Sequence, residues 1–321
     1  MTTALPGDLP EAAMRSEAGT DPALAAQALP FVSVIIPVYN DNRRLQICLD
    51  SLARQAYAAD RFEVIVVDNG SVPPADGNVT AGSNVRMLVE PRSEGFIARN
   101  TGLAAASGGV IAFTDADCYP EPGWIEAGIA AIGSSRVIVA GHVVAFPALP
   151  AAPTAAERFE MLFGFEQDKN ATRGVSVTAN LICRRGAFDE AGLFNTDSHS
   201  AHDYEWCQQA VRCGFRVVYA RNAAVRTPAR RSLAALTLKI RRMSGAHYVR
   251  GRSRKKLWAH RFGALLNMRP PLRRMRRVLS QPGIGSWRQR AALCCILMAL
   301  PVVYAIEWVR MEAGLGPAER R

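Results

Sequence analysis

The sequence predicts an α/β fold, with a mixed, mainly parallel sheet that carries helices on both faces and a basic helical C-terminal extension. The first observation is that near-continuous Val/Ile runs alternate with segments of helical spacing between residues 31 and 225, as in a sheet covered on both faces. The second is that three of these runs end in polar clusters. The third is a change to a wholly basic composition after residue 225.

Each element is placed by its own pattern. Apolar runs predict strands over residues 32–37, 63–68, 86–90 and 110–114, and leucine spacing predicts helices over 43–55 and 95–106 between them. Further along, the pattern predicts helices over 123–133, 157–167 and 203–212, and strands over 136–146, 175–183 and 215–219. No glycine-rich phosphate loop of the dehydrogenase or NTPase type occurs, which argues against those classes.

Polar side chains follow three of the predicted strands. The first strand ends in Pro37, Tyr39 and Asn40, the second in Asp68, and the fourth in the pair of carboxylates in FTDADC (113–118). Because ligands of open α/β sheets bind outside the carboxyl ends of the strands, we expect these clusters to share one crevice. Two carboxylates that close repel each other unless a cation lies between them.

Composition divides the chain into four parts. Residues 1–30 read as a flexible tail without a signal peptide, 31–225 as the α/β domain that holds the candidate site, 226–290 as a basic helical segment and 291–310 as an apolar membrane-associating helix. The net charge of +11 arises from the basic segment, which holds 19 Lys and Arg and no Asp or Glu. Such a run indicates a surface that faces a polyanion. Seven cysteines without a C-x-x-C motif indicate a reducing compartment.

Six segments in order resemble the family 2 glycosyltransferases, which have the Rossmann-like GT-A fold. They are VSVIIPVYN (32–40), EVIVVDNGS (63–71), GFIARNTGLAAASG (95–108), IAFTDADC (111–118), TANLICRRGAFDEAGLFN (178–195) and HDYEWCQQAVRCGFRVVY (202–219). The resemblance implies transfer of a hexose-type sugar from a nucleotide-sugar donor, with inversion and with Mg²⁺ or Mn²⁺. Hard cations of this kind take carboxylate oxygens and neutralise a diphosphate leaving group.

The resemblance also implies roles for individual residues. Asp117 would hold the metal, and Asp115 would serve the ribose or the metal through water. Asp68 would accept hydrogen bonds from the base or ribose, although an Asx-turn at the strand end explains it as well. Arg99 would face the diphosphate, with a buried ion pair to Asp115 as the alternative. The pocket would be shaped by Pro37, Tyr39 and Asn40.

Displacement at the sugar needs a base for the acceptor hydroxyl, and the family position for it matches Asp203. A helix N-cap is the alternative for this Asp. His202 stands where the family usually has Glu, and the match to a further family metal ligand falls near Arg226, so both the acceptor contacts and a third ligand are open. The Gln209-x-x-Arg212 sequence lies too close to Asp203 to be the motif of processive synthases. A non-processive enzyme is therefore expected.

The C-terminal part points to a membrane. Residues 291–306 are 16 uncharged residues flanked by Trp and Arg, and the preceding cations favour an anionic lipid surface. A helix buried against the catalytic domain is the alternative. We therefore expect a lipid-linked or glycan acceptor at the cytoplasmic face of the cell membrane, with the protein peripheral, monotopic or spanning once. Aromatics are too sparse among the cations to favour nucleic acid.

Two other functions remain open. A sugar nucleotidyltransferase also uses paired carboxylates, although it usually carries a basic glycine-rich loop after the first strand. An inactive protein of this fold that binds a polyanion or a membrane would explain the basic segment without catalysis.

Overall fold

The computed structural model describes residues 29–75, 82–92, 95–133, 136–196, 202–253, 271–284 and 286–315. The predicted tail over 1–30 therefore lies outside the described residues except for its last two positions. Residues 31–321 form one unit by their internal contacts.

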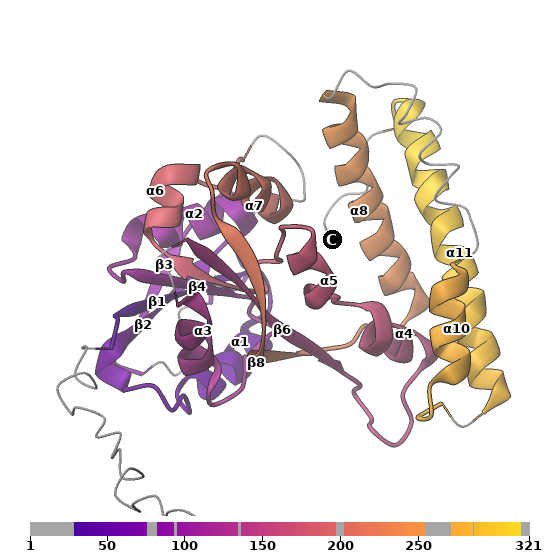
Figure 1. Cartoon of the computed structure of the whole chain (residues 1–321), viewed down its shortest axis with the longest axis horizontal. Coiled ribbons are helices and arrows are strands. Elements are labelled where there is room, and N and C mark those ends of the chain that lie inside the picture. Colours follow the sequence, from indigo (N-terminus) through magenta and orange to yellow (C-terminus); the bar gives the residue numbers. More distant parts are fainter. Residues whose placement is uncertain are drawn as a thin grey trace, which may run out of the picture. The chain divides into compact units, whose positions relative to one another are not determined.

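An eight-stranded mixed sheet forms the centre of this unit, in the order β3-β2-β1-β4-β7-β6-β8-β5 (Figure 1). Its strands are β1 Val32–Val38, β2 Phe62–Asp68, β3 Val85–Val89, β4 Val110–Thr114, β5 Tyr119–Pro120, β6 Val137–Phe146, β7 Asn180–Arg184 and β8 Arg216–Pro228. Strands β1 to β4 are mutually parallel, β7 runs antiparallel between β4 and β6, and β6 pairs in parallel with β8. The predicted mixed, mainly parallel sheet is confirmed.

Helices cover both faces of the sheet. They are α1 Asn42–Leu52, α2 Gly95–Ala105, α3 Trp124–Ile132, α4 Ala155–Phe163, α5 Gln167–Thr172, α6 Gly186–Ala191 and α7 His202–Arg212, with a short 3-10 turn at Ala59–Arg61. Leu45 of α1 and Ile125 of α3 enter the core on one face, whereas Leu103 of α2 and Trp206 of α7 enter the core on the other. Each helix therefore buries the apolar stripe that its sequence predicts.

Three elements differ from the sequence prediction. The helix expected over 157–167 is two helices, because α4 ends at Phe163 and Gly164 caps it. The strand expected over 175–183 begins only at Asn180. The last strand continues to Pro228, well past the predicted residue 219. Polar residues in a bulge interrupt its alternation, which is why the pattern ended early.

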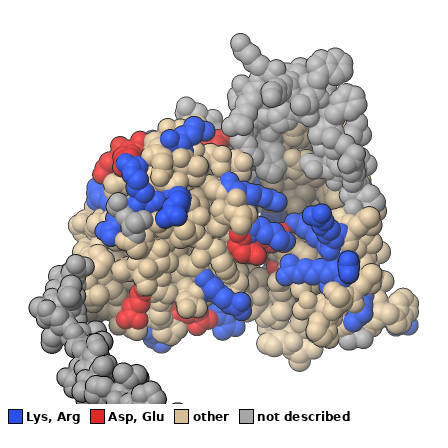
Figure 2. Space-filling view, in the orientation of Figure 1, with Lys and Arg blue, Asp and Glu red and all other residues tan. Residues whose placement is uncertain are grey.

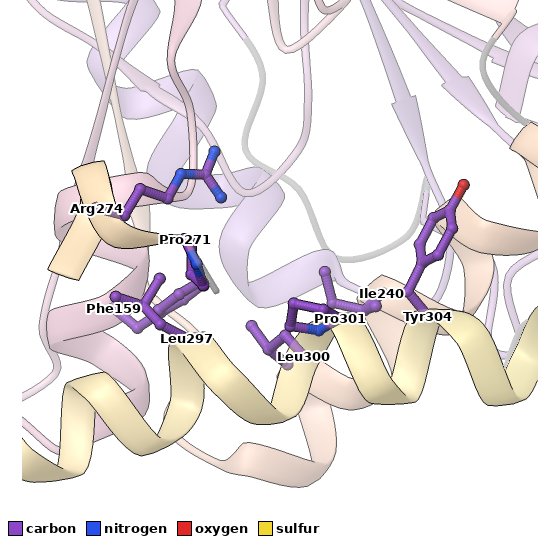
Figure 3. Close-up of a pocket in the computed structure, with 8 residues that line it drawn as sticks. All are labelled: Phe159, Ile240, Pro271, Arg274, Leu297, Leu300, Pro301 and Tyr304. Carbon is purple, nitrogen blue, oxygen red and sulfur yellow. The ribbon is translucent and has the colours of Figure 1, made fainter. Parts of the chain in front are cut away.

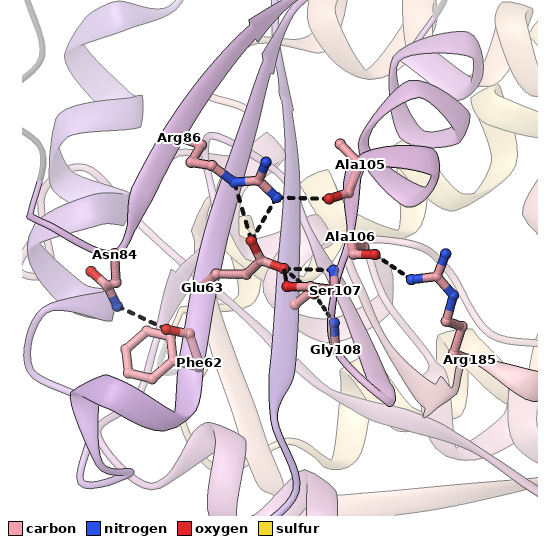
Figure 4. A network of polar contacts seen from close by, with 10 residues as sticks. Phe62, Glu63, Asn84, Arg86, Ala105, Ala106, Ser107, Gly108 and Arg185 are labelled. Atoms are coloured by element: carbon pink, nitrogen blue, oxygen red, sulfur yellow. Dashed lines mark hydrogen bonds and ion pairs between the residues drawn. The ribbon is translucent and has the colours of Figure 1, made fainter.

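Glu63 joins the first three strands through a buried polar network (Figure 4). Its carboxylate accepts the Ser33 hydroxyl at 2.7 Å, the Ser107 N–H at 2.7 Å and the Arg86 guanidinium at 2.7 Å. Burial alone would raise the pKa of Glu63, but the hydrogen bonds from Ser107, Ser33 and Arg86 outweigh it and lower the pKa to about 2. The ionised form therefore stabilises the folded sheet.

Glu63→Gln is expected to lower the free energy of unfolding at pH 7 by about 2 kcal/mol, because a pKa held below its unfolded value stores stability in the charged form. That stability is complete above the ordinary Glu pKa and is lost as the pH falls toward 2, so the two proteins should converge in acid. Urea unfolding at pH 7 and pH 3 measures this. Glu126→Gln, at an exposed site on α3, is the matched control and should change little. A constant difference between the two pH values would contradict the charge argument.

The C-terminal extension consists of α8 Leu233–Ser253, α10 Leu272–Ser280 and α11 Trp287–Glu312, which pack with α4 beside the sheet domain (Figure 1). Their shared core includes Phe159 of α4, Leu236 of α8, Val278 of α10 and Leu293 of α11. A basic helical segment is thus present, although it starts after β8 rather than at residue 226. Residues 254–270 of the predicted segment lie outside the described residues.

Carboxylates from outside the basic segment neutralise part of its charge. Glu160 of α4 binds Arg230 and Lys239, each at 2.8 Å, and Glu307 of α11 binds Arg241 at 2.7 Å. These internal pairs reduce the charge that the basic segment presents outward, and a polyanion-facing surface for its other cations stays a prediction. The pairs could not be read from the sequence because the partners lie 66 to 79 residues away in the chain.

Candidate active site

The loops after β1 and β2 are tied to each other at the carboxyl edge of the sheet. Asn40 adopts a left-handed backbone with φ 52°, a conformation that Asn tolerates better than most residues. Its N–H donates to the Ser71 hydroxyl at 2.9 Å, and its side-chain oxygen accepts the Val72 N–H at 2.7 Å. Tyr39 beside it is 46% exposed, and Pro37 is half-buried at the end of β1. Two of the predicted polar clusters thus meet.

Asp68 is buried, and loop backbone satisfies its carboxylate. One oxygen accepts the N–H of Ser71 at 2.9 Å and the other accepts the N–H of Ala75 at 2.8 Å. These are the bonds of the turn-forming alternative. A contact between Asp68 and a nucleotide stays a prediction. Because both of its carboxylate oxygens already bind loop backbone, Asp68 would act mainly by holding that loop in place.

Asp115 and Asp117 lie together just past β4. One ligand atom from each of these carboxylates and from Cys118 lies within 4.8 Å of the others, the one such three-group cluster in the part of the chain that the structure describes. Burial first, and then the charge of Asp115, raise the pKa of Asp117 to about 6. A divalent cation bound between two crowded carboxylates would relieve their repulsion and would favour the charged form of Asp117. Burial raises the pKa of the Cys118 thiol, which suits packing better than a hard metal.

Arg99 of α2 is buried and forms an ion pair with Asp115. Its Nη1 also donates to the Gly95 carbonyl at 3.0 Å, and the guanidinium lies 4.8 Å from the centre of the Phe96 ring. The ion-pair alternative is therefore what the structure shows. Its Nε has no hydrogen-bond partner among the described residues, so Arg99 keeps donor capacity at the pocket.

Asp203 lies in the first turn of α7, whose described part begins at His202. The N-cap alternative and the role of a base both stay predictions. Its carboxylate accepts the Tyr204 N–H at 2.8 Å. Burial raises the pKa of Asp203, while the nearby charge of Arg99 lowers it and that of Asp115 raises it. Because the charges of Arg99 and Asp115 both act on Asp203, this residue lies near the carboxylate pair after β4.

His202 is buried against an aromatic ring of α2. It is 3% exposed, and its ring lies 4.2 Å from the Phe96 ring. The departure from the family pattern therefore fills the core on the α2 side. Arg226, where a further metal ligand was left open, pairs in β8 with Tyr119 and lies 3.8 Å from Glu121. It supplies no carboxylate or imidazole.

The sequence analysis missed Arg230 and Glu160. Arg230 follows the end of β8, and its charge lowers the pKa of Asp117, which places a cation near the pair of carboxylates after β4. Glu160, 2% exposed, holds Arg230 in place. The sequence offered only one signal for Glu160, a carboxylate within a helix rich in aromatic residues. Such a carboxylate belongs to no recognisable motif.

Comparisons with known proteins agree with this geometry. The model for glycosyl transferase family 2 matches residues 33–191. Glycosyltransferase AglE of Haloferax volcanii is 36% identical over 211 residues, 63% of this chain and 68% of that protein. Pre-mycofactocin glycosyltransferase of Mycobacterium tuberculosis is 31% identical over 200 residues, 59% of this chain and 40% of that protein. The chain therefore covers less than half the length of this second relative.

A solved structure shows the same fold. Mannosyltransferase PcManGT from Pyrobaculum calidifontis, in complex with GDP-Man and Mn²⁺, superposes with a TM-score of 0.58 at 18% identity and covers 88% of both chains. This confirms the predicted GT-A architecture with its C-terminal helices. The sequence match to AglE and the family model together show that the chain belongs to glycosyl transferase family 2, a family of transferase enzymes.

Proposed function

We propose that the chain transfers a sugar from a nucleotide-sugar donor to a lipid-linked or polysaccharide acceptor at a membrane, non-processively and with inversion. The observation that carries this proposal is the pair of carboxylates after β4, with Asp203 near enough for the charge of Asp115 to act on it. A metal-binding pair and a separate carboxylate are what direct displacement at an anomeric carbon requires.

Asp117 and Asp115 would hold the divalent cation, Mg²⁺ or Mn²⁺, because their crowded carboxylates fit it. The cation, when bound, would stabilise charge on the diphosphate leaving group. Arg230 adds a fixed positive charge on the same side, held by Glu160 at 2.8 Å. Arg99, paired with Asp115, keeps that carboxylate oriented.

Asp203 would take the proton from the acceptor hydroxyl. Its pKa, raised by burial, makes its carboxylate a stronger base than an ordinary Asp. Tyr39 and Asn40 would border the nucleotide, and Asp68 would keep the adjoining loop in place.

A donor screen tests this function. The full-length protein is incubated with UDP-, GDP-, TDP- and CDP-sugars and Mg²⁺ or Mn²⁺, and release of nucleoside diphosphate is measured. We expect at least one donor to release nucleoside diphosphate, and we expect EDTA to abolish that release. Pyrophosphate formation from a nucleoside triphosphate and a sugar phosphate would instead identify a nucleotidyltransferase.

Helix α11 supports the membrane part of the proposal. It is long and apolar enough to cross a bilayer, and a third of its most apolar window is buried within the protein. The opposite face exposes a stripe at helical spacing that carries no charge, made of Ala291, Cys295, Met298, Ala299, Val302, Ile306 and Val309. An exposed apolar stripe on an otherwise packed helix is typical of a surface that contacts lipid.

The buried face of α11 is fixed by charge. Glu307 is fully buried and binds Arg241 of α8 at 2.7 Å and Arg310 at 3.0 Å. Pulling α11 away to span a bilayer would leave a buried charge unpaired, which is costly. We therefore infer that α11 rests in the membrane interface with the catalytic domain on the cytoplasmic side. The cations of α10 would add up to about 1 kcal/mol each against anionic lipid.

The double variant Val302→Glu/Ile306→Glu is expected to lose most of its binding to vesicles of phosphatidylglycerol and phosphatidylcholine, because charge enters the lipid-facing stripe. Flotation at low salt measures it. The control Leu149→Glu/Val89→Glu places the same charges at exposed apolar sites away from the stripe and should still float. Equal flotation of both variants would show that the stripe does not face lipid.

A further inference from the structure

The β6–β8 ladder carries a bulge beside a polar pocket. Its register shifts between Gly141 and His142, so residues 221–223 of β8 form an extra bulge opposite them. The side chain of Asn180, fully buried, fills the gap by donating to the carbonyls of His142 and Ala223, each at 2.9 Å. Bulges of this kind re-aim side chains beside functional sites.

The bulge borders a polar pocket of about 320 Å³. Inside it, a His142 ring nitrogen and the Tyr219 hydroxyl form a hydrogen bond of 2.8 Å, with Arg221 and Asp168 lining the same space and Phe165 as an apolar wall. Burial first, and then Arg221, lower the pKa of His142, which favours the uncharged ring. A carboxylate, a guanidinium, a phenol and an imidazole beside an aromatic wall suit an uncharged polyol, such as a sugar ring.

This pocket adjoins the proposed active site. Glu160 lines it, and the same carboxylate binds Arg230, whose charge acts on Asp117. The Glu160–Arg230 pair therefore borders the polar pocket, and its cation acts on the proposed metal-binding carboxylates.

A cationic cluster lies on the other side of the polar pocket. Glu166 binds Arg274 at 2.7 Å, lies 3.7 Å from Arg277, and also pairs with Lys169. Arg274 and Arg277 both lie 5.5 Å from the centre of the Phe163 ring. Lys and Arg atoms gather where α10 lies, with acidic atoms beside them (Figure 2). One carboxylate among three cations leaves positive charge for an anion such as phosphate.

Beyond Arg274 lies an apolar cavity of about 210 Å³ between α4, α8, α10 and α11 (Figure 3). It is lined by Phe159, Ile240, Pro271, Arg274, Leu297, Leu300, Pro301 and Tyr304. Pro301 has no N–H and interrupts the α11 hydrogen-bond ladder at this point. Arg274 is the one charged group in the lining, and its guanidinium points away from the apolar side chains.

The polar pocket suits a polyol, the cationic cluster suits an anion and the apolar cavity suits a hydrocarbon chain, and they lie in that order. Glu166 joins them because it lines the polar pocket and binds Arg274, which lines the cavity. We propose that they bind the acceptor as a lipid-phosphate-linked sugar, with its sugar in the polar pocket, its phosphate at Arg274 and Arg277, and the start of its chain in the apolar cavity. This rests on the proposed function and specifies its acceptor site. The sugar would then lie beside the Glu160–Arg230 pair, which borders the proposed reacting centre.

Titration of the full-length protein with decyl phosphate, without any donor, tests the anion and chain sites. We expect binding clearly tighter than that of inorganic phosphate, and a loss of about tenfold or more in Arg274→Gln, as removal of one charge-assisted contact gives. Arg273→Gln, the adjacent exposed cation on α10, is the matched control and should bind as wild type. Ile240→Trp should weaken decyl phosphate but not inorganic phosphate, whereas Leu233→Trp, exposed on the same helix, should change neither.

Decyl phosphate esters of glucose, galactose, mannose and N-acetylglucosamine test the sugar site. At least one should bind more tightly than decyl phosphate, and Asp168→Asn or Tyr219→Phe should remove that gain while leaving decyl phosphate affinity unchanged. If no ester gains affinity, the sugar assignment is wrong. If decyl phosphate does not bind, or if Arg273→Gln and Arg274→Gln weaken its binding equally, the anion and chain sites are wrong. Release of nucleoside diphosphate from the donor is measured separately, so failure of the acceptor site and failure of the transferase are distinguishable.

Discussion

Asp117→Asn is expected to abolish sugar transfer and to weaken binding of Mg²⁺ or Mn²⁺, with the fold intact. The site lies past the end of β4 rather than in the core, so the substitution removes a metal-ligating oxygen without opening a cavity. Loss of metal-assisted stabilisation of the leaving group should reduce nucleoside diphosphate release to background. Donor turnover and Mn²⁺ titration of the same preparation measure the two effects.

The control for this experiment is Asp50→Asn, which makes the same chemical change on the exposed face of α1. It should retain full activity and metal affinity. Thermal unfolding verifies that both variants are folded. Activity that survives in EDTA, or in Asp117→Asn, would overturn the metal-dependent mechanism.

Asp203→Asn is expected to bind donor normally and to lose turnover by about 10²–10⁴-fold, the usual contribution of a general base. The asparagine keeps the shape and can still accept the Tyr204 N–H, but it cannot take a proton. In the wild type, transfer should fall in acid around a pKa above the ordinary value for Asp, because burial raises the pKa of Asp203 and protonation removes the base. Initial rates against pH and donor KM measure this.

Glu205→Gln, two residues further along α7, is the matched control and should leave both kcat and the pH profile unchanged. A variant of Asp203 that loses donor affinity but keeps its turnover would show that the carboxylate only stabilises the helix start. The base would then lie elsewhere in the pocket.

Much of the sheet domain follows from the sequence because its signals are local. Val110 to Thr114 is an uninterrupted buried strand, and Asp115 and Asp117 follow it directly, so their position at the strand end could be predicted. The pairing of Arg99 with Asp115 could be named only as one alternative. A guanidinium in a helix has several carboxylates within reach, and backbone geometry decides among them.

The extension could not be predicted in the same way. The length of α11 and its lack of charge are visible in the sequence, whereas the division of its surface into a packed face and an exposed stripe depends on where α4, α8 and α10 lie. The partners of Arg230 and Arg241 are likewise set by tertiary structure. The role of Asp68 in a turn could be predicted, because an Asp at a strand end is a local signal for an Asx-turn. The structure shows the expected bonds from loop N–H groups to its carboxylate.

The side chain of Asn180 limits how this protein can diverge over evolution. Besides its two bonds to the bulge, its oxygen accepts the Trp124 indole N–H at 2.9 Å, and a Cβ on Gly141 would lie 2.2 Å from that same oxygen. No other side chain offers the same acceptor and pair of donors at that length. A substitution at Trp124, Gly141 or Asn180 is therefore disfavoured unless the other two residues change as well. Among descendants of a common ancestor, Trp124, Gly141 and Asn180 should be inherited or replaced as one unit.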